Sequence, residues 1–306
     1  MQLHPEAAAV LAFVESLELP EIHTVTPDEA REGRAALRAP ASGECHHIED
    51  VDAGGVPARL YRSNDDVTGL TIWIHGGGWV TGDVDGHETV CRSLANRSGH
   101  AVLSVGYRLA PEDPFPAGLH DCLTATRWAR ESAHELGIDP DRIAIAGDSA
   151  GANLAAAVAN DAPIALRFQL LIYPVADAQA AIDQQTYDSY QENGDGYFLT
   201  AAAMRWFVDQ YLAGDEGAPD DPRVSPLYET EERLAAAPPA LVITAGFDPL
   251  RDEGMAYAAR LSAAGVTTSH VHLSGQIHGF FSLLTVLSDA RMVHALVGQA
   301  LADALA

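Results

Sequence analysis

The sequence predicts an α/β protein with one large, mainly parallel sheet of about eight strands and helices on both faces. Short β-branched runs alternate with helical stretches along most of the chain, which is typical of parallel strands joined by crossover helices. An early hairpin adds antiparallel edge strands. The chain has 306 residues, of which 47% are hydrophobic, and this is enough for a single large core.

The expected elements follow in order along the chain. Residues 1–45 form two amphipathic helical stretches, each bounded by proline, that precede the first strand. A hairpin over about His47 to Arg62 turns at Gly54-Gly55. Six further strands have the sequences LTIWIHG, AVLSVGYR, RIAIAGD, QLLIYPV, ALVITAGF and TSHVHL. Helices are expected over about residues 88–98, 117–137, 149–160, 255–265 and 285–304.

A long excursion without core strands separates QLLIYPV from ALVITAGF. Residues 177–239 are first polar, then helical from Thr200 to Ala213, then proline-rich. An insertion of this length is more typical of a functional element than of a plain loop. We expect it to form half of a helical cap, with residues 1–45 as the other half. The catalytic core would then consist of residues 46–176 and 240–306.

Composition excludes several classes of function. The formal net charge of −25 and the pI near 4.6 disfavour binding to nucleic acid or to anionic membrane surfaces. The chain contains no lysine, so its 18 basic residues are all arginine. Schiff-base enzymes, Ser-x-x-Lys hydrolases and P-loop nucleotide hydrolases each need a lysine amine. A catalytic base must therefore be histidine or a carboxylate.

Cysteine usage and the N-terminus favour a cytoplasmic protein. The N-terminus lacks a basic segment, and no apolar run approaches the roughly 20 residues of a membrane span. No membrane insertion is therefore expected. The cysteines follow no disulfide pattern, which favours free or buried thiols in a reducing compartment. They are Cys45, Cys91 and Cys122.

One group of residues suggests a metal site, but weakly. Cys45, His46 and His47 are followed by Glu49 and Asp50. Alternate residues of a strand point to opposite faces, and no second cluster completes a ligand set. We expect no metal and no cofactor.

Residues 147–151 read GDSAG, the G-x-S-x-G pattern of a nucleophile elbow. The pattern alone is weak, but DRIAIAGD before it favours a strand and SAGANLAAAVAN from Ser149 favours a helix. Gly147 and Gly151 fit a turn that strains the serine backbone and leaves no room for neighbouring side chains. Ser149 is the predicted nucleophile, and an ordinary glycine-rich turn is the alternative.

Candidates for the acid and the base follow the last two strands. Asp248 directly follows ALVITAGF, and His278 follows the final strand in a glycine-flanked loop. The order Ser149, Asp248, His278 is the one expected of an α/β-hydrolase. Among alternative acids, Asp252 and Glu253 lie where a helix begins.

The other histidines lack this context. The chain has 13 of them. His270 and His272 lie within a strand, where they are expected to pack or to face solvent. Three more fall on expected helices, where a surface position is usual. These are His120, His134 and His294.

Residues 75–79 read HGGGW directly after a strand. Consecutive glycines leave backbone amides open to a substrate carbonyl, as in the oxyanion loop of lipases and esterases, although a flexible turn has the same composition. The N–H of Ala150, at the start of the elbow helix, is a further donor.

Together these motifs resemble the bacterial hormone-sensitive-lipase family of carboxylesterases. The resemblance also includes YRLAPEDPFPAGLHD at 107–121, YFLT at 197–200, FDPLRDEG and HGF. It implies an α/β-hydrolase fold with a helical cap. It also implies an oxyanion hole at Gly77, Gly78 and Ala150, with His75 and Gly76 supporting the loop. Ala152 departs from the family pattern, because many members have a second glycine there.

Aromatic residues are candidates for the substrate pocket. Trp206, Phe207 and Tyr211 have helical spacing and either line an acyl pocket or hold the cap together. In full, the pocket candidates are Trp79, Trp206, Phe207 and Phe280.

The resemblance implies a carboxylesterase that cleaves short- to medium-chain acyl esters through an acyl-Ser149 intermediate. The alternatives are an amidase, lactonase or deacetylase with the same triad, or a non-catalytic protein that binds a small ligand. The plant gibberellin receptor resembles this family but has lost its catalytic histidine, whereas His278 is present here. The partner expected is a small-molecule ester, and a homodimer is compatible with the sequence. The natural ester and its leaving group stay open.

Overall fold

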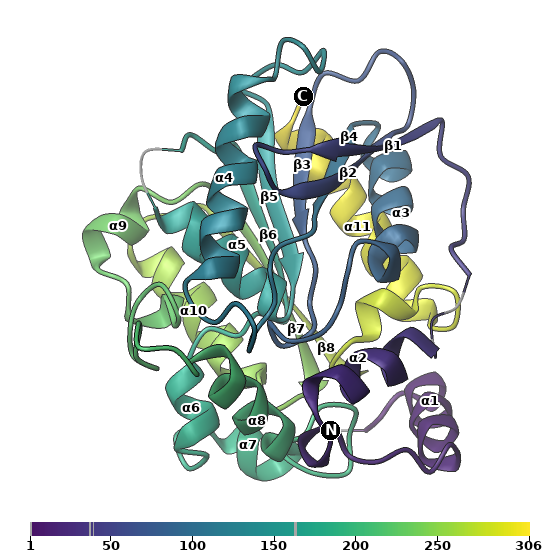
Figure 1. Ribbon diagram of the computed structural model, residues 1–306, viewed down its shortest axis with the longest axis vertical. Helices are drawn as coiled ribbons and strands as arrows, with labels where there is room; N and C mark the ends of the chain where they lie inside the picture. Colours follow the sequence, from purple (N-terminus) through teal and green to yellow (C-terminus); the bar gives the residue numbers. More distant parts are fainter. Residues whose placement is uncertain (1, 37, 39, 162–163) are drawn as a thin grey trace.

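The computed structural model describes residues 2–36, 38, 40–161 and 164–306 (Figure 1). It contains an eight-stranded sheet in the order β1-β2-β4-β3-β5-β6-β7-β8. β1 pairs antiparallel with β2, and β2 antiparallel with β4, whereas the other neighbours pair in parallel. The predicted mainly parallel sheet with an antiparallel edge is therefore confirmed. The strands are β1 (His47–Asp52), β2 (Pro57–Arg62), β3 (Leu70–Ile74), β4 (Ala101–Val105), β5 (Ile143–Asp148), β6 (Phe168–Ile172), β7 (Ala240–Phe247) and β8 (Thr268–Ile277).

Helices cover both faces of this sheet. Successive side chains of β3 point to opposite faces of the sheet. Ile72 and Trp73 accordingly lie in two different hydrophobic clusters. Burial on both faces explains why the strands read as nearly continuous apolar runs. The Ile72 face is covered by α4 (Ala117–Glu131), α5 (Ala150–Asn160) and α10 (Arg251–Ala263), and the Trp73 face by α3 (Glu88–Ser98) and α11 (Ser288–Ala304).

Several helix boundaries differ from the sequence expectation. The helix expected over 117–137 ends at Glu131, and the chain continues in turns to Gly137, which has a φ of +68°. α10 begins at Arg251 rather than near 255, because Gly254 does not interrupt it.

The remaining α-helices lie in the N-terminal segment and in residues 177–239. Figure 1 shows α1 and α2 (purple) and α6 to α8 (green) at one end of the sheet, where β7 and β8 end. α8 packs against the 3₁₀ turn η1, so the two segments meet there. They comprise α1 (Pro5–Ser16), η1 (Ile22–Thr24), α2 (Pro27–Ala36), α6 (Ala178–Ile182), α7 (Asp188–Asn193), α8 (Ala201–Tyr211), η3 (Pro226–Tyr228) and α9 (Glu231–Ala235).

One histidine does not lie where the sequence analysis expects it. His294 is fully buried between α11 and α3, although a surface position is the expectation for a helical histidine. Its ring hydrogen-bonds to Ser93 Oγ (2.9 Å) and to the Phe281 carbonyl (3.0 Å). Burial lowers the pKa of His294 to about 4, so the ring is neutral at pH 7. Its helical spacing from buried Ala290 and Val297 is a signal that indicates the buried face.

No helix in the described part of the chain is both long enough and apolar enough to cross a membrane.

Candidate active site

The nucleophile elbow forms between β5 and α5. Ser149 has φ +57° and ψ −122°, a conformation that side chains rarely adopt. A Cβ on Gly147 would lie 2.5 Å from the carbonyl carbon of Gly151, and one on Gly151 would collide with the Ile74 carbonyl. Glycine is therefore required at both positions, as the sequence analysis expects. The Ser149 N–H donates to the Ile172 carbonyl (2.9 Å), which fixes the turn on β6.

The structure brings the predicted serine, histidine and aspartate together. Ser149 Oγ lies 2.9 Å from Nε2 of His278, and Nδ1 of the same ring lies 2.7 Å from Oδ2 of Asp248. Asp248 is fully buried, and its other oxygen accepts the Leu250 N–H at 2.9 Å. Ser149 is only 8% exposed. These contacts form one continuous hydrogen-bonded chain.

Strand register explains why the acid and the histidine meet. β7 and β8 are parallel, and Phe247 is paired with Ile277. Asp248 and His278 each follow directly after this pair, so they leave the sheet side by side. Gly279, with φ +80°, then turns the chain into the next 3₁₀ segment.

The alternative acids are engaged elsewhere. Asp252 accepts from the Arg251 guanidinium (2.6 Å) and from the Ser189 N–H (2.8 Å). Glu253 is fully buried, and its carboxylate accepts the Ala176 N–H at 2.9 Å. Burial, followed by the charge of Asp177, raises the pKa of Glu253.

The other strand and helix histidines lie away from Ser149. His270 and His272 both hydrogen-bond to Thr244 Oγ1, at 2.8 and 2.9 Å. Burial lowers the pKa of each. His120 and His134 are exposed, as expected for surface helices.

The three glycines of HGGGW are each required by a different neighbour. A Cβ on Gly76 would lie 2.5 Å from the Asp148 carboxylate. Gly77 and Gly78 have φ values of +130° and +61°, and a Cβ there would collide with the Thr81 carbonyl and the Phe207 ring, respectively. The loop therefore holds a tight, fixed turn.

The backbone N–H groups of this loop divide into two kinds. The Gly76 N–H donates to Oδ1 of Asp148 at 2.9 Å. By contrast, no described group accepts a hydrogen bond from the N–H of Gly77, Gly78 or Ala150. These three donors are available for a ligand, and Gly76 instead anchors the loop.

A buried polar cluster lies behind the oxyanion loop. Asp148 faces Nε2 of His87 at 3.3 Å. Burial alone would raise the pKa of Asp148, but His87 and the Gly76 N–H together hold it below its usual value. The His75 ring stacks between His87 (5.4 Å) and Tyr107 (4.3 Å), and Tyr107 donates to the His75 carbonyl at 2.9 Å. Burial and then His87 lower the pKa of His75 to about 3, so this ring is neutral.

The pocket candidates occupy two kinds of position. Trp79 and Phe280 are almost completely buried, and Trp79 stacks on Tyr211 at 4.4 Å. Phe207 packs directly on Gly78, and half-buried Trp206 meets the Phe207 ring edge-on at 5.2 Å.

Sequence reasoning did not single out Phe198. This ring is 48% exposed, and its nearest atom is 3.2 Å from the position that a Cβ on Gly279 would take, next to His278. Its position in the YFLT segment was the available signal. The residue is a further candidate for substrate contact.

The cysteine and histidine cluster near β1 does not form a ligand set. His46 pairs with Asp65 at 2.8 Å, and Cys45 donates to the Arg62 carbonyl at 3.1 Å. Within residues 2–36, 38, 40–161 and 164–306, no three His, Cys, Asp or Glu side chains are placed to hold a metal ion.

Comparison with known proteins identifies the class to which this fold and site belong. A family model described as an alpha/beta hydrolase fold matches residues 71–282. The chain therefore belongs to the α/β-hydrolase family, in its hormone-sensitive-lipase-like branch, as the resemblance in the sequence predicts.

Named relatives and solved structures agree with this assignment. Ethyl acetate hydrolase of Pseudomonas putida is 38% identical, over 98% of this chain and 99% of the relative. The carboxylic ester hydrolase LipN of Mycobacterium tuberculosis is 42% identical, over 84% of this chain and 71% of the relative. A hyperthermophilic esterase from Pyrobaculum calidifontis superimposes with a TM-score of 0.90 at 36% identity, and the match covers 100% of both chains.

Proposed function

We propose that this protein is a serine carboxylesterase in which Ser149, His278 and Asp248 hydrolyse small-molecule esters. The observation that carries the proposal is the continuous chain from Ser149 Oγ through His278 to Asp248, at 2.9 and 2.7 Å. Such a chain lets a neutral imidazole take the serine proton while the buried carboxylate holds the ring and stabilises its charge.

The first half-reaction forms the acyl-enzyme. Ser149 Oγ attacks the ester carbonyl carbon as its proton moves to Nε2 of His278, and the carbonyl π electrons move to oxygen. The tetrahedral intermediate then collapses, the bond to the alcohol oxygen breaks, and His278 returns the proton to that oxygen. The products are an alcohol and acyl-Ser149.

The second half-reaction regenerates the enzyme. Water donates a proton to Nε2 of His278 as its oxygen attacks the acyl carbon. Collapse of this intermediate breaks the bond to Ser149 Oγ, which recovers the proton, and a carboxylic acid leaves.

The oxyanion formed in both steps needs preorganised donors. We assign this role to the N–H groups of Gly77, Gly78 and Ala150, since each is without an acceptor in the described structure. Loss of one such donor typically reduces kcat by about 10²- to 10³-fold. The N-terminal end of α5 adds positive potential at the same place.

The substrate class is supported by relatives and by local packing. Named relatives are an ethyl acetate hydrolase and carboxylic ester hydrolases. We propose that residues 1–45 and 177–239 cap a core of 46–176 and 240–306, because Phe207 of α8 packs on the oxyanion loop. A capped pocket accepts a limited acyl length, and each methylene that fits contributes about 0.8 kcal/mol. The family resemblance implies a preference for roughly two to eight acyl carbons, and the falling gain per methylene once the pocket is full would set the upper limit.

A series of p-nitrophenyl esters tests this function, assayed beside an amide and a lactone panel. The wild type should cleave short esters and react with an organophosphate, whereas Ser149→Ala should do neither and should keep its circular dichroism spectrum. Full activity of Ser149→Ala would refute the mechanism. A chain-length optimum above about twelve carbons would contradict the cap assignment.

We also propose a cytoplasmic location. It is supported by the three cysteines, none of which forms a disulfide. Homodimer formation is a prediction that gel filtration with light scattering tests.

A further inference from the structure

One arginine of helix α2 contacts the residues that directly follow the HGGGW oxyanion loop. Arg31 is about three-quarters buried, and its Nε donates to the Val80 carbonyl at 2.8 Å. Its Nη2 donates to the Ala110 carbonyl at 2.8 Å, and the guanidinium also binds the Glu112 carboxylate at 2.6 and 2.9 Å. One side chain of the N-terminal segment therefore links two loops of the core.

Both loops are hydrogen-bonded to the HGGGW segment. The Ala110 N–H donates to the Trp79 carbonyl at 2.9 Å. The N–H groups of Val80 and Thr81 donate to the Gly77 carbonyl at 3.2 and 2.9 Å. The contacts of Arg31 thus stabilise the turn formed by residues 77–81, in which Val80 and Thr81 donate to the Gly77 carbonyl.

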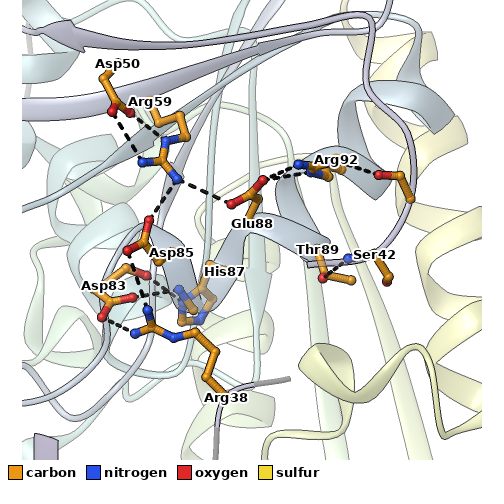
Figure 2. Close-up of polar contacts among 12 residues, drawn as sticks. Arg38, Ser42, Asp50, Arg59, Asp83, Asp85, His87, Glu88, Thr89 and Arg92 are labelled. Carbon is orange, nitrogen blue, oxygen red and sulfur yellow. Dashed lines mark hydrogen bonds and ion pairs between the residues drawn. The ribbon is translucent and has the colours of Figure 1, made fainter. Parts of the chain in front are cut away.

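A second arginine contacts the residues that follow this turn. Arg38 pairs with Asp83 and Asp85, and Figure 2 shows its guanidinium beside these carboxylates and next to His87. The Asp83 carbonyl hydrogen-bonds to Nδ1 of His87 at 3.2 Å. Nε2 of His87 faces Asp148, which holds the Gly76 N–H.

The part of the N-terminal segment that follows Arg38 makes further contacts with α3. Figure 2 shows Arg92 between Glu88 and the chain after Arg38. Arg92 donates to the Gly43 carbonyl at 2.7 Å, and the Ser42 N–H donates to Thr89 at 2.9 Å. The chain that follows α2 is therefore also held against α3.

We propose that α2 positions the oxyanion hole, and that Arg31 is the positioning residue. Three consecutive glycines lose more backbone freedom than any other sequence, so the loop needs outside contacts to keep its N–H groups aimed at one point. Charge-assisted hydrogen bonds to carbonyl oxygens supply them. Lysine cannot replace the planar Arg31 guanidinium, because a lysine ammonium group is a single point charge. The inference rests on the proposed esterase function.

Arg31→Met tests the proposal with p-nitrophenyl acetate. We expect kcat to fall by roughly 10- to 100-fold with little change in KM, because the oxyanion develops only in the transition state. The inhibition constant of a trifluoromethyl ketone, whose adduct places an oxyanion in the same hole, should rise by a similar factor. Arg31→Lys should show most of the loss, and a purely structural role would not produce this split.

Arg127→Met is the control, because it removes the same charge from an exposed helix position. Arg127 lies on α4, is exposed, and among the described residues pairs with Asp161 at 3.6 Å. Its kcat should stay near the wild-type value. Hydrogen–deuterium exchange provides a readout that needs no activity: the amides of Val80 and Thr81 should exchange faster in Arg31→Met, and their exchange should be unchanged in Arg127→Met.

Three results would overturn the proposal. They are wild-type kcat in a folded Arg31→Met or Arg31→Lys variant, an equal loss in Arg127→Met, and unchanged loop exchange in the Arg31 variants. If Arg31→Met does not fold, Arg31→Lys decides the question. Failure of the wild type to hydrolyse any ester would refute the proposed function instead, and the exchange experiment would still test the contact.

Discussion

Replacing Asp248 by asparagine tests the proposed catalytic chain, because this change alters a proton position without altering shape. Oδ1 of Asp248 accepts the Leu250 N–H at 2.9 Å, so the asparagine oxygen is needed there. Its NH2 group then faces Nδ1 of His278, where a carboxylate oxygen lies at 2.7 Å in the wild type. The imidazole must carry its proton on Nε2 and cannot accept one from Ser149.

The size of the loss follows from the two orientations of the amide. In the favoured one the wrong tautomer faces Ser149, and loss of the orienting acid in other triads costs about 10⁴ in kcat, or about 5 kcal/mol. The flipped amide restores the tautomer but leaves the buried Leu250 N–H without an acceptor. That penalty of about 1–3 kcal/mol limits the productive population to roughly a sixth or less. The rate should therefore fall at least about sixfold and as much as about 10⁴-fold.

Steady-state kinetics with p-nitrophenyl acetate measures this loss, with Asp252→Asn as the control. Asp252 is bound to Arg251 and to the Ser189 N–H, so its replacement should leave kcat nearly unchanged. A loss smaller than about fivefold for Asp248→Asn would refute the tautomer argument. A greater loss for Asp252→Asn would reassign the acid.

Three further predictions concern stability. Tyr107→Phe leaves the buried His75 carbonyl without its donor and should cost about 1–3 kcal/mol in urea unfolding; no measurable change would contradict the contact. Burial raises the folded-state pKa of Glu253, so stability should fall as pH rises above 4.5, and Glu253→Gln should remove that decline. The folded-state pKa of His294 is lowered to about 4, so stability present above pH 6.5 should be lost toward pH 4, and less steeply in His294→Gln.

The parts of the site that sequence predicts are those set by local geometry. The GDSAG elbow needs only a strand, a turn and a helix in succession, and its two glycines are required by contacts within that turn. Asp248 and His278 each follow a strand, and parallel strands end at the same edge of a sheet. Their meeting therefore follows from topology, once neighbouring strands are recognised.

The parts that sequence does not predict depend on contacts between distant segments. Arg31 is one of 18 arginines, and nothing in its neighbourhood indicates that it reaches the Val80 carbonyl. The helices α6 and α7 have five and six residues, too short for a helical period to be recognised. The surface position expected of His294 is wrong because the contact with Ser93 of α3 buries it, and only its spacing from other apolar residues of α11 indicates this face.

The HGGGW loop shows how the two kinds of information combine. Its glycines are visible in the sequence, but their separate roles depend on which N–H already has an acceptor. Asp148 accepts the Gly76 N–H, whereas the N–H groups of Gly77 and Gly78, the proposed oxyanion donors, have no acceptor among the described residues. The residue before the nucleophile thus anchors the loop that serves the nucleophile. A substitution at Asp148 should consequently impair oxyanion stabilisation while leaving Ser149, His278 and their hydrogen bond in place.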